Sequence, residues 1–342
     1  MKRLPLLLAL ALPIQAQDFL NPAEPTGTPA LEPDKVEGPT KEAAELFREG
    51  KHHAAIEAAR PLAEKGNVDA LFLLAYAAES GQGMEANREE ALKYYLQASE
   101  KGSKEATYRR ALILLNSEDE EERLAGKTAL EEAVEGDPGN AGRILGEAWM
   151  RGLIDKTPNF DEAVKAWKTS KEAGDQTSLI LLARLYSGDF GFADKSDLKQ
   201  SIALYREAAA LEVPAAYLPL GSRLLNGDPE QRNEEEGRKW LAKAIEAEQF
   251  SAYLALGDFE ENAKKDPKAA LEAYLKGAGK GEVECMLRCA RFFYQGLAGD
   301  KEPAKGLEWL EKAAEAGSAM ANFELARLSS GEEKPNMIKI YM

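Results

Sequence analysis

The chain has 342 residues and a formal net charge of −15, with 59 acidic side chains against 44 basic ones. Such a charge repels phosphate backbones and anionic lipid headgroups, and no basic run offsets it, so we expect no nucleic-acid partner. The two cysteines are too few for an exported fold that depends on disulfide bonds.

The N-terminal residues 1–16 have the three-part layout of a secretory signal peptide. Lys2 and Arg3 form a basic start, an apolar run of 11 residues follows, and Ala16 is a plausible cleavage residue. The run is too short to cross a bilayer, so we predict no transmembrane segment there. The alternative is an apolar strand or helix of the fold. We expect an exported protein, periplasmic or extracellular, whose mature chain begins near Gln17.

The next segment, residues 17–39, contains five prolines and few apolar residues. Proline removes backbone donors and fixes φ, which suits an extended spacer rather than a packed element. We therefore predict a disordered leader. Because the signal peptide carries two positive charges and no negative one, its removal would leave a mature chain of charge −17.

The remaining chain repeats a short pattern that ends in glycine or glutamate. One copy is EALKYYLQASEKG at 90–102, and an aromatic residue stands seven or eight positions before the end of each copy: Tyr95, Trp167, Tyr205, Trp240, Tyr274 and Trp309. The equivalent ends are Gly66, Gly102, Gly136, Gly174, Glu212, Glu248, Gly281 and Gly317. Successive ends are 33 to 38 residues apart. A fixed period in this range predicts a solenoid.

The other half of each repeat has apolar residues three and four positions apart, the period of a helix packed on one face. In 70–84, 141–152 and 216–227 a small residue lies mid-helix: Ala75, Gly146 and Gly221. We expect it to let a second helix approach closely, and the recurring aromatic residue to fill the gap between neighbouring pairs. A closing glycine is predicted to adopt the left-handed C-terminal conformation. Each repeat should therefore be helix, loop, helix.

These motifs resemble the SEL-one-like repeat (SLR), a relative of the tetratricopeptide repeat with a longer loop between its helices. The matching positions are Leu145, Gly146, Trp149 and Gly152 in one repeat; Gly81, Gly83, Met84, Ala91, Tyr94 and Tyr95 in another; and Ala313, Ala314 and Gly317 in a third. The resemblance covers about residues 40–331. It implies an all-α fold, a right-handed superhelical α-solenoid of about eight helix-turn-helix repeats plus a closing helix. Residues 332–342 would form a tail that caps the last helix.

Three repeats depart from the pattern. The first lacks the long loop, the third has Arg110 at its leucine position, and the seventh, residues 250–281, is short. We expect the superhelix to bend irregularly near the third and seventh. Cys285 and Cys289 fall on the small and leucine positions of the eighth repeat, which favours core packing over an intrahelical bridge.

No motif predicts catalysis, a metal or a cofactor. The GKT at 126–128 lacks the first glycine of a phosphate loop, and the DFG at 189–191 has no accompanying kinase triplet. His52 and His53 are adjacent, so their helical side chains diverge and would not share a metal ion. We expect no enzyme, no catalytic residue, no metal site and no cofactor.

The resemblance implies an adaptor, scaffold or regulator of the bacterial cell envelope that holds a protein or peptide in its concave groove. Read off the copies, the groove residues on the first helices would be Phe72, Tyr76, Arg143, Glu147, Met150, Arg184, Arg291 and Tyr294. The alternative is that they only cover neighbouring helices. The acidity favours a basic partner, and we expect a monomer.

Two other functions stay open at this point. A few cysteine-rich relatives are associated with penicillin binding and β-lactam hydrolysis, but they carry a cysteine pair in nearly every repeat and this chain has one. A purely structural spacer is the second alternative.

Overall fold

The computed structural model describes residues 38–329, which divide into two compact units at Ser196 and Asp197. The predicted signal peptide, most of the predicted leader and the predicted capping tail lie outside the described residues. Throughout 38–329 the regular structure is helical and no strand occurs. The prediction of an all-α fold is confirmed.

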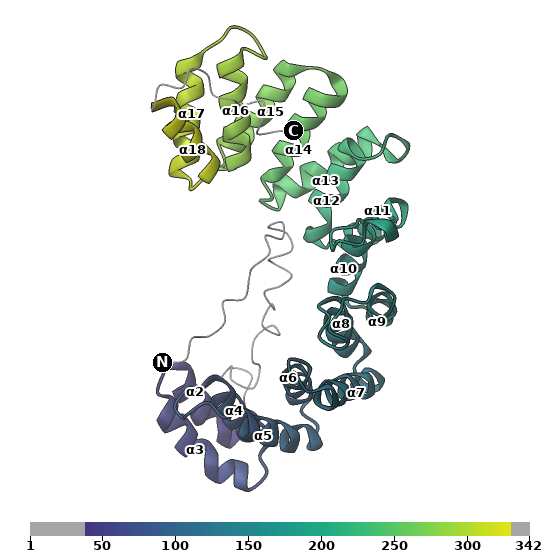
Figure 1. Ribbon diagram of the computed structural model, residues 1–342, viewed down its shortest axis with the longest axis vertical. Helices are drawn as coiled ribbons and strands as arrows, with labels where there is room; N and C mark the ends of the chain where they lie inside the picture. Colours follow the sequence, from purple (N-terminus) through teal and green to yellow (C-terminus); the bar gives the residue numbers. More distant parts are fainter. Residues whose placement is uncertain (1–37, 330–342) are drawn as a thin grey trace. The chain divides into compact units, whose positions relative to one another are not determined.

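The first unit contains nine α-helices within its described part (Figure 1). They are α2 (Lys41–Arg48), α3 (His52–Glu64), α4 (Val68–Ser80), α5 (Arg88–Glu100), α6 (Lys104–Leu115), α7 (Glu120–Gly136), α8 (Pro138–Met150), α9 (Phe160–Glu172) and α10 (Gln176–Tyr186). Short 3-10 turns occur at Gly38–Thr40 and Ala193–Lys195. Consecutive helices pack against one another, and α6 also contacts α8.

The second unit contains eight α-helices within its described part. They are α11 (Leu198–Ala210), α12 (Tyr217–Asn226), α13 (Glu234–Glu246), α14 (Ser251–Phe259), α15 (Pro267–Ala278), α16 (Val283–Gln295), α17 (Pro303–Glu315) and α18 (Ala319–Ser329). The 3-10 turns Pro214–Ala216 and Pro229–Gln231 lie in loops, and a π-turn, Glu260–Lys264, extends α14 in the irregular seventh repeat. In chain order the described helices form eight pairs and a closing helix, α18, as predicted; α10 and α11, the fifth pair, are divided between the units.

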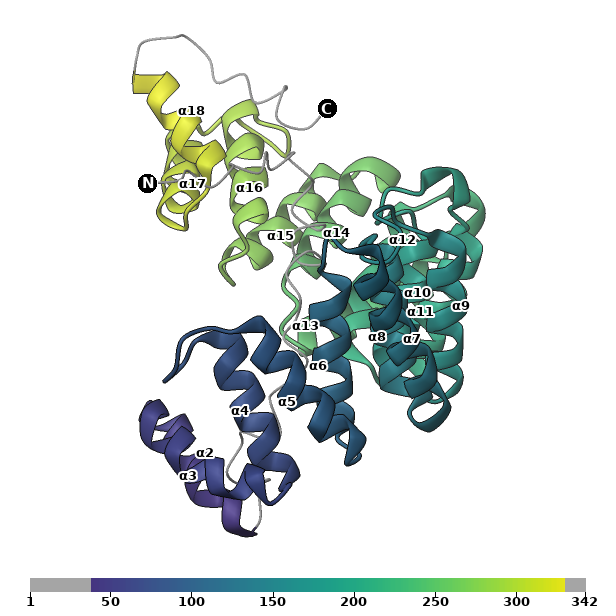
Figure 2. The same cartoon turned by 60° about the horizontal axis from the view of Figure 1, so that its bottom comes forward.

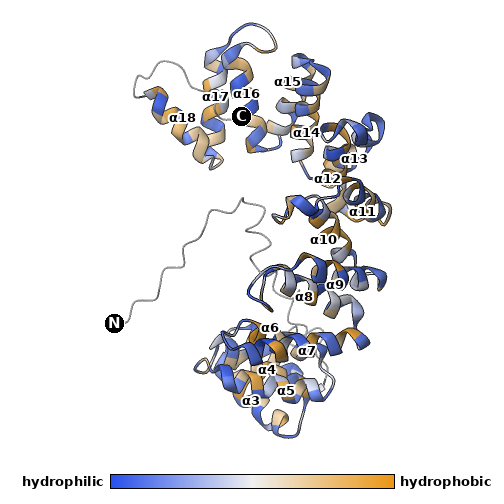
Figure 3. Ribbon diagram, turned by 45° about the vertical axis from the view of Figure 1, so that its right-hand side comes forward, coloured by the Kyte–Doolittle hydropathy of each residue, from blue (hydrophilic) through white to orange (hydrophobic). Residues whose placement is uncertain are grey.

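Asparagine, aspartate and serine residues begin most of these helices. The side chain of the N-cap accepts a hydrogen bond from a backbone N–H of the first turn at Asn67, Asn87, Ser103, Asp119, Asp137, Asn159, Asp175, Asp197, Asn233 and Asp266. Each bond satisfies a donor that the helix itself cannot pair. Figure 2 shows α4, α5 and α6 side by side, and in Figure 3 hydrophobic and hydrophilic residues alternate along the helices.

The repeat ends that were expected to stop the second helix of each pair do adopt the left-handed conformation, with one exception. The φ angle is positive at Gly66, Gly102, Gly174, Glu212, Glu248, Gly281 and Gly317. Gly136 instead ends α7 directly, because Asp137 serves at once as the C-cap of α7 and the N-cap of α8. Of the closing glycines, Gly81 and Gly152 are left-handed, but Gly227 has φ −79°.

The recurring aromatic residue fills the core only when it stands seven positions before the repeat end. Tyr95, Trp167, Tyr205 and Tyr274 hold that position, and their side chains are at most 1% exposed. Trp240 and Trp309 stand eight positions before the end and are half-buried, while the next residues, Leu241 and Leu310, take the core position. Trp240 and Trp309 therefore pack beside the core rather than inside it, because one helical position turns a side chain by about 100°. Trp309 lies against the core cluster of the second unit, and Trp240 stacks on Tyr217.

Cys285 and Cys289 are fully buried on α16 and are not bridged. Burial raises the pKa of the Cys289 thiol to about 12 and that of Cys285 further. Both thiols pack in the core cluster of the second unit with Tyr274 and Phe292. The expectation of core packing is confirmed.

Candidate functional site

The predicted groove residues do not all reach the surface. Phe72 is 1% exposed and packs edge to face against Tyr95, with 5.5 Å between ring centroids. Met150, the last residue of α8, is 5% exposed. Both were expected to point into an open groove, and that placement is wrong. Each first helix buries a wider apolar stripe than the comparison of the repeats indicated, because helices on both sides pack against it.

Three further predicted groove residues of the first unit, Arg143, Glu147 and Arg184, are half-buried and form contacts within the chain. Arg143 contacts Glu147 at 2.9 Å on its own helix and lies 3.8 Å from Asp175, the N-cap of α10. Burial raises the pKa of the Glu147 carboxyl, although Arg143 beside it opposes the rise. Arg184 lies 3.6 Å from Asp189 in the following loop, and its guanidinium is 5.0 Å from the ring centre of Phe190. These arginines therefore stabilise neighbouring elements.

A recurring ion pair joins the first helices of successive repeats. Of its residues, the sequence analysis predicted only Arg291 as part of a site. Arg109 on α6 lies 3.8 Å from Glu79 on α4, and Arg291 on α16 contacts Glu261, in the π-turn after α14, at 2.6 Å. Arg288 on α16 lies 3.5 Å from Asp258 on α14. In all three pairs the arginine stands 30 residues after its acid. This constant spacing could have been found in the sequence.

Buried tyrosine hydroxyls add to the same networks. Tyr95 donates a hydrogen bond to Glu79 at 2.6 Å, and the single hydroxyl proton of Tyr274 is shared between Asp258 at 2.8 Å and Glu261 at 2.9 Å. Burial raises the pKa of both phenols, so each stays a donor at neutral pH. The arrangement links the second helix of a repeat to the first helix of the same repeat. We call the surface that the first helices present within one unit, with Tyr76 and Arg143 in the first unit and Arg291 and Tyr294 in the second, the first-helix surface.

The predicted tyrosines lie on this first-helix surface, each in its own unit. Tyr76 on α4 packs edge to face with Phe47, 5.9 Å between centroids, and the guanidinium of Arg109 lies 5.2 Å from its ring centre. Tyr294 on α16 is half-buried against the core of the second unit. Both side chains thus present part of a ring to solvent.

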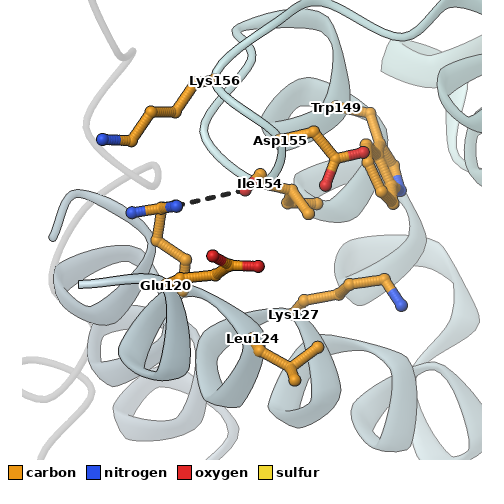
Figure 4. A pocket seen from close by; sticks show the side chains of 8 residues that line it. Glu120, Leu124, Lys127, Trp149, Ile154, Asp155 and Lys156 are labelled. Carbon is orange, nitrogen blue, oxygen red and sulfur yellow. Dashed lines mark hydrogen bonds between the residues drawn. The ribbon is translucent and has the colours of Figure 1, made fainter. Parts of the chain in front are cut away.

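A half-open cavity of about 540 Å³ lies between the start of α7 and the end of α8 (Figure 4). Its lining residues are Glu120, Arg123, Leu124, Lys127, Trp149, Ile154, Asp155 and Lys156. Arg123 is 7% exposed and closes one side: it donates to the carbonyl oxygens of Ile154 at 3.2 Å, Ser117 at 3.1 Å and Glu118 at 2.7 Å. One buried guanidinium thereby fastens the loop after α8 to the loop before α7.

A second cavity, of about 440 Å³, lies among α5, α6 and α7 and is lined in part by Leu96, Tyr108 and Arg110. Arg110 stands where other repeats bury Leu74, Leu182 or Leu220 at 2% exposure or less. Within residues 38–329 its side chain has no hydrogen bond or ion pair. The third repeat thus places a cationic side chain at its leucine position, on the wall of this cavity.

The described residues offer no metal site. No three His, Cys, Asp or Glu side chains between 38 and 329 are placed to hold an ion. His52 packs edge to face on Phe47, with centroids 4.5 Å apart, whereas His53 is exposed. None of the helices in this range is long and apolar enough to cross a membrane.

Comparison with protein families finds the Sel1 repeat at residues 68–103, 177–213, 214–248 and 283–318. These are the second, fifth, sixth and eighth of the predicted repeats. The three repeats that depart from the pattern are not matched, and neither is the fourth. Among curated proteins, no relative matches this chain.

Two solved structures share the fold. A Sel1 repeat protein from Oxalobacter formigenes is 21% identical, with 92% of this chain and 90% of that one covered and a TM-score of 0.56. A protective antigen of uropathogenic Escherichia coli with an SLR fold is 19% identical, with 89% and 70% covered and a TM-score of 0.56. The chain thus carries Sel1 repeats and has the helical solenoid fold of Sel1 repeat proteins.

Proposed function

We propose that the protein is a non-enzymatic scaffold or adaptor of the bacterial cell envelope that holds a protein or peptide partner on the first-helix surface of its repeats. The observation that carries the proposal is the set of four Sel1 repeats, since proteins built from such repeats generally mediate protein interactions. The half-exposed rings of Tyr76 and Tyr294 support it, because aromatic side chains are enriched at interface hot spots. The net charge of −15 favours a basic partner.

The hydrolase alternative finds no support. The single cysteine pair is buried and unbridged, and burial keeps both thiols protonated. The spacer alternative differs from our proposal in one measurable respect: substitutions on the first-helix surface would then change no interaction.

Partner capture from envelope extract should fall when this surface is altered. Arg143→Gln with Glu147→Gln removes both charges of the 2.9 Å pair on α8, and Tyr294→Ala removes a ring from the other unit. A hot-spot residue is worth about 2 kcal/mol, or roughly thirtyfold in affinity. Lys168→Gln, an exposed change on α9, is the control. If folded variants of both kinds capture every partner as well as the control does, the first-helix surface is not the binding surface.

Export is tested at the N-terminus. Protein recovered from the periplasm or medium should begin near Gln17, as determined by N-terminal sequencing. Cytoplasmic protein that retains Met1 would contradict this part of the proposal.

A further inference from the structure

The last described helix, α18, is a first helix that no second helix follows within residues 38–329. Its inner side packs beside α17 (Figure 1), where Ala321 is buried and Leu325 lies against the core cluster of the second unit. Its other side carries Met320, Phe323 and Ala326, which are exposed and three positions apart, so they share one side of the helix. We call these three residues the open face of α18.

Phe323 is the most exposed large hydrophobic residue in the described chain, at 62%. It stands six residues after a repeat end, and so do Phe72 and Leu287. Phe72 is 1% exposed because Tyr95, on the second helix of its repeat, packs edge to face on its ring, and Leu287 is 4% exposed beside α17. The open face of α18 is therefore the side that a second helix covers in those repeats.

The sequence after α18 supplies an apolar segment that can reach this face. In residues 335–342, PNMIKIYM, five of the eight side chains are methionine, isoleucine or tyrosine, and the only charge is that of Lys339. Five residues, 330–334, separate this segment from the end of α18. Four residues separate α6 from α7 and seven separate α16 from α17, so the connection has a length that this chain uses between paired helices.

We propose that residues 335–342 bind to the open face of α18 of their own chain, with Ile338 and Tyr341 against Phe323, and that this contact prevents a second copy from binding there. The segment is attached five residues from the helix, so its effective concentration at the face is on the order of millimolar, which favours it over a second copy. The proposal gives the predicted capping tail its contacts, and it does not depend on the proposed function.

The first test follows the methyl signal of Met320 in the full chain labelled with carbon-13 at its methionine methyl groups. The sequence has seven methionines, and a Met320→Leu variant assigns the signal from the open face. Removing residues 335–342 should shift the Met320 signal and leave those of Met84 and Met150, in the first unit, in place. The synthetic peptide PNMIKIYM, added to the shortened chain, should return the Met320 signal in a saturable way.

Substitutions on both sides of the contact test its residues. Phe323→Ser should weaken binding of the peptide to the shortened chain about tenfold, because a large apolar side chain leaves the interface. Leu211→Ser is the matched control, since Leu211 is 55% exposed at the end of α11 in the same unit. In the full chain, Ile338→Ser with Tyr341→Ser should shift the Met320 signal as removal of the segment does, without shortening the chain.

The second test measures self-association by sedimentation equilibrium. The weight-average mass of the full chain should stay at that of one chain as its concentration rises. The mass of the shortened chain should rise toward that of two chains, because an uncovered apolar face binds another one. Phe323→Ser in the shortened chain should cancel the rise.

The proposal is wrong if the Met320 signal stays in place both on removal of residues 335–342 and in the Ile338/Tyr341 double variant. Equal binding of the peptide to the Phe323→Ser variant and to the Leu211→Ser control would also contradict it. A Met320 signal that moves with the concentration of the full chain would assign the open face to a second copy instead. A shortened chain that keeps the mass of one chain would overturn the claim that the segment prevents association.

Discussion

Replacing Gly146 by alanine should lower the free energy of unfolding by about 3 kcal/mol, although alanine normally favours a helix. A Cβ atom at Gly146 would lie 2.3 Å from Cδ1 and 2.4 Å from Nε1 of Trp167. The indole cannot retreat without loss, because Trp167 is fully buried and donates its N–H to the carbonyl oxygen of Arg143 at 3.1 Å. The added methyl group must therefore separate α8 from α9. Urea unfolding followed by circular dichroism measures the change.

Gly139→Ala on the same helix is the matched control. A Cβ at Gly139 meets only the Asp137 side chain, at 3.9 Å, so the substitution should be neutral or stabilise by up to about 1 kcal/mol. Gly257→Ala repeats the test in the second unit, where the added atom would lie 2.3 Å from the ring of Tyr274. Gly146→Ala protein as stable as the Gly139→Ala control would show that the two helices do not need this close approach.

The small residue in the middle of the first helix could be predicted from the sequence, because it recurs at the same position in several repeats. The sequence predicted that a second helix approaches closely at this residue, but not which side chain of that helix meets it. The structure places Gly146 against Trp167 and Gly221 against Leu241, so the close approach is confirmed at both; Gly257, which lies against Tyr274, was not among the predicted small residues.

The sequence did not show which of two adjacent residues of the second helix, the aromatic residue or the leucine after it, lies in the core. Trp240 and Trp309 are the same residue type as Trp167 and stand at nearly the same place in the repeat. Leu241 and Leu310 nevertheless hold the core position, and Gly221 packs against Leu241. Leucine and tryptophan both satisfy an apolar slot, so pattern alone does not choose between adjacent residues. Trp240 instead stacks on Tyr217, with ring centroids 5.6 Å apart.

The candidate sites were less predictable because they depend on pairing between repeats. The sequence placed Arg143 and Arg291 on first helices, but whether a guanidinium is free depends on an acid about 30 residues away, Asp175 or Glu261. The cavity of Glu120 and Asp155 arises from one helix start and one loop that no single repeat contains. A motif aligned within one repeat does not report such contacts.

The same substitution, to leucine, should destabilise the protein at one arginine of the third repeat and not at another. Arg123→Leu should lower the free energy of unfolding by about 4.5 kcal/mol, since hydrogen bonds from a charged group each contribute about 1.5 kcal/mol and three carbonyls lose their donor. Thermal unfolding of the full chain, followed by circular dichroism, measures the loss.

Arg110→Leu should instead be neutral or raise stability by about 1 kcal/mol, because leucine would restore apolar packing in the cavity beside α6. Nothing comparable is lost, since the Arg110 side chain has no hydrogen-bond or ion-pair partner between residues 38 and 329. Equal destabilisation by both substitutions would mean that Arg110 is held by contacts outside that range. Equal tolerance would mean that the three carbonyls find water once Arg123 is removed, and that the loop after α8 does not depend on its guanidinium. Changes of opposite sign in the free energy of unfolding would show that the third repeat lacks a packing residue at Arg110 and depends on the buried charge of Arg123.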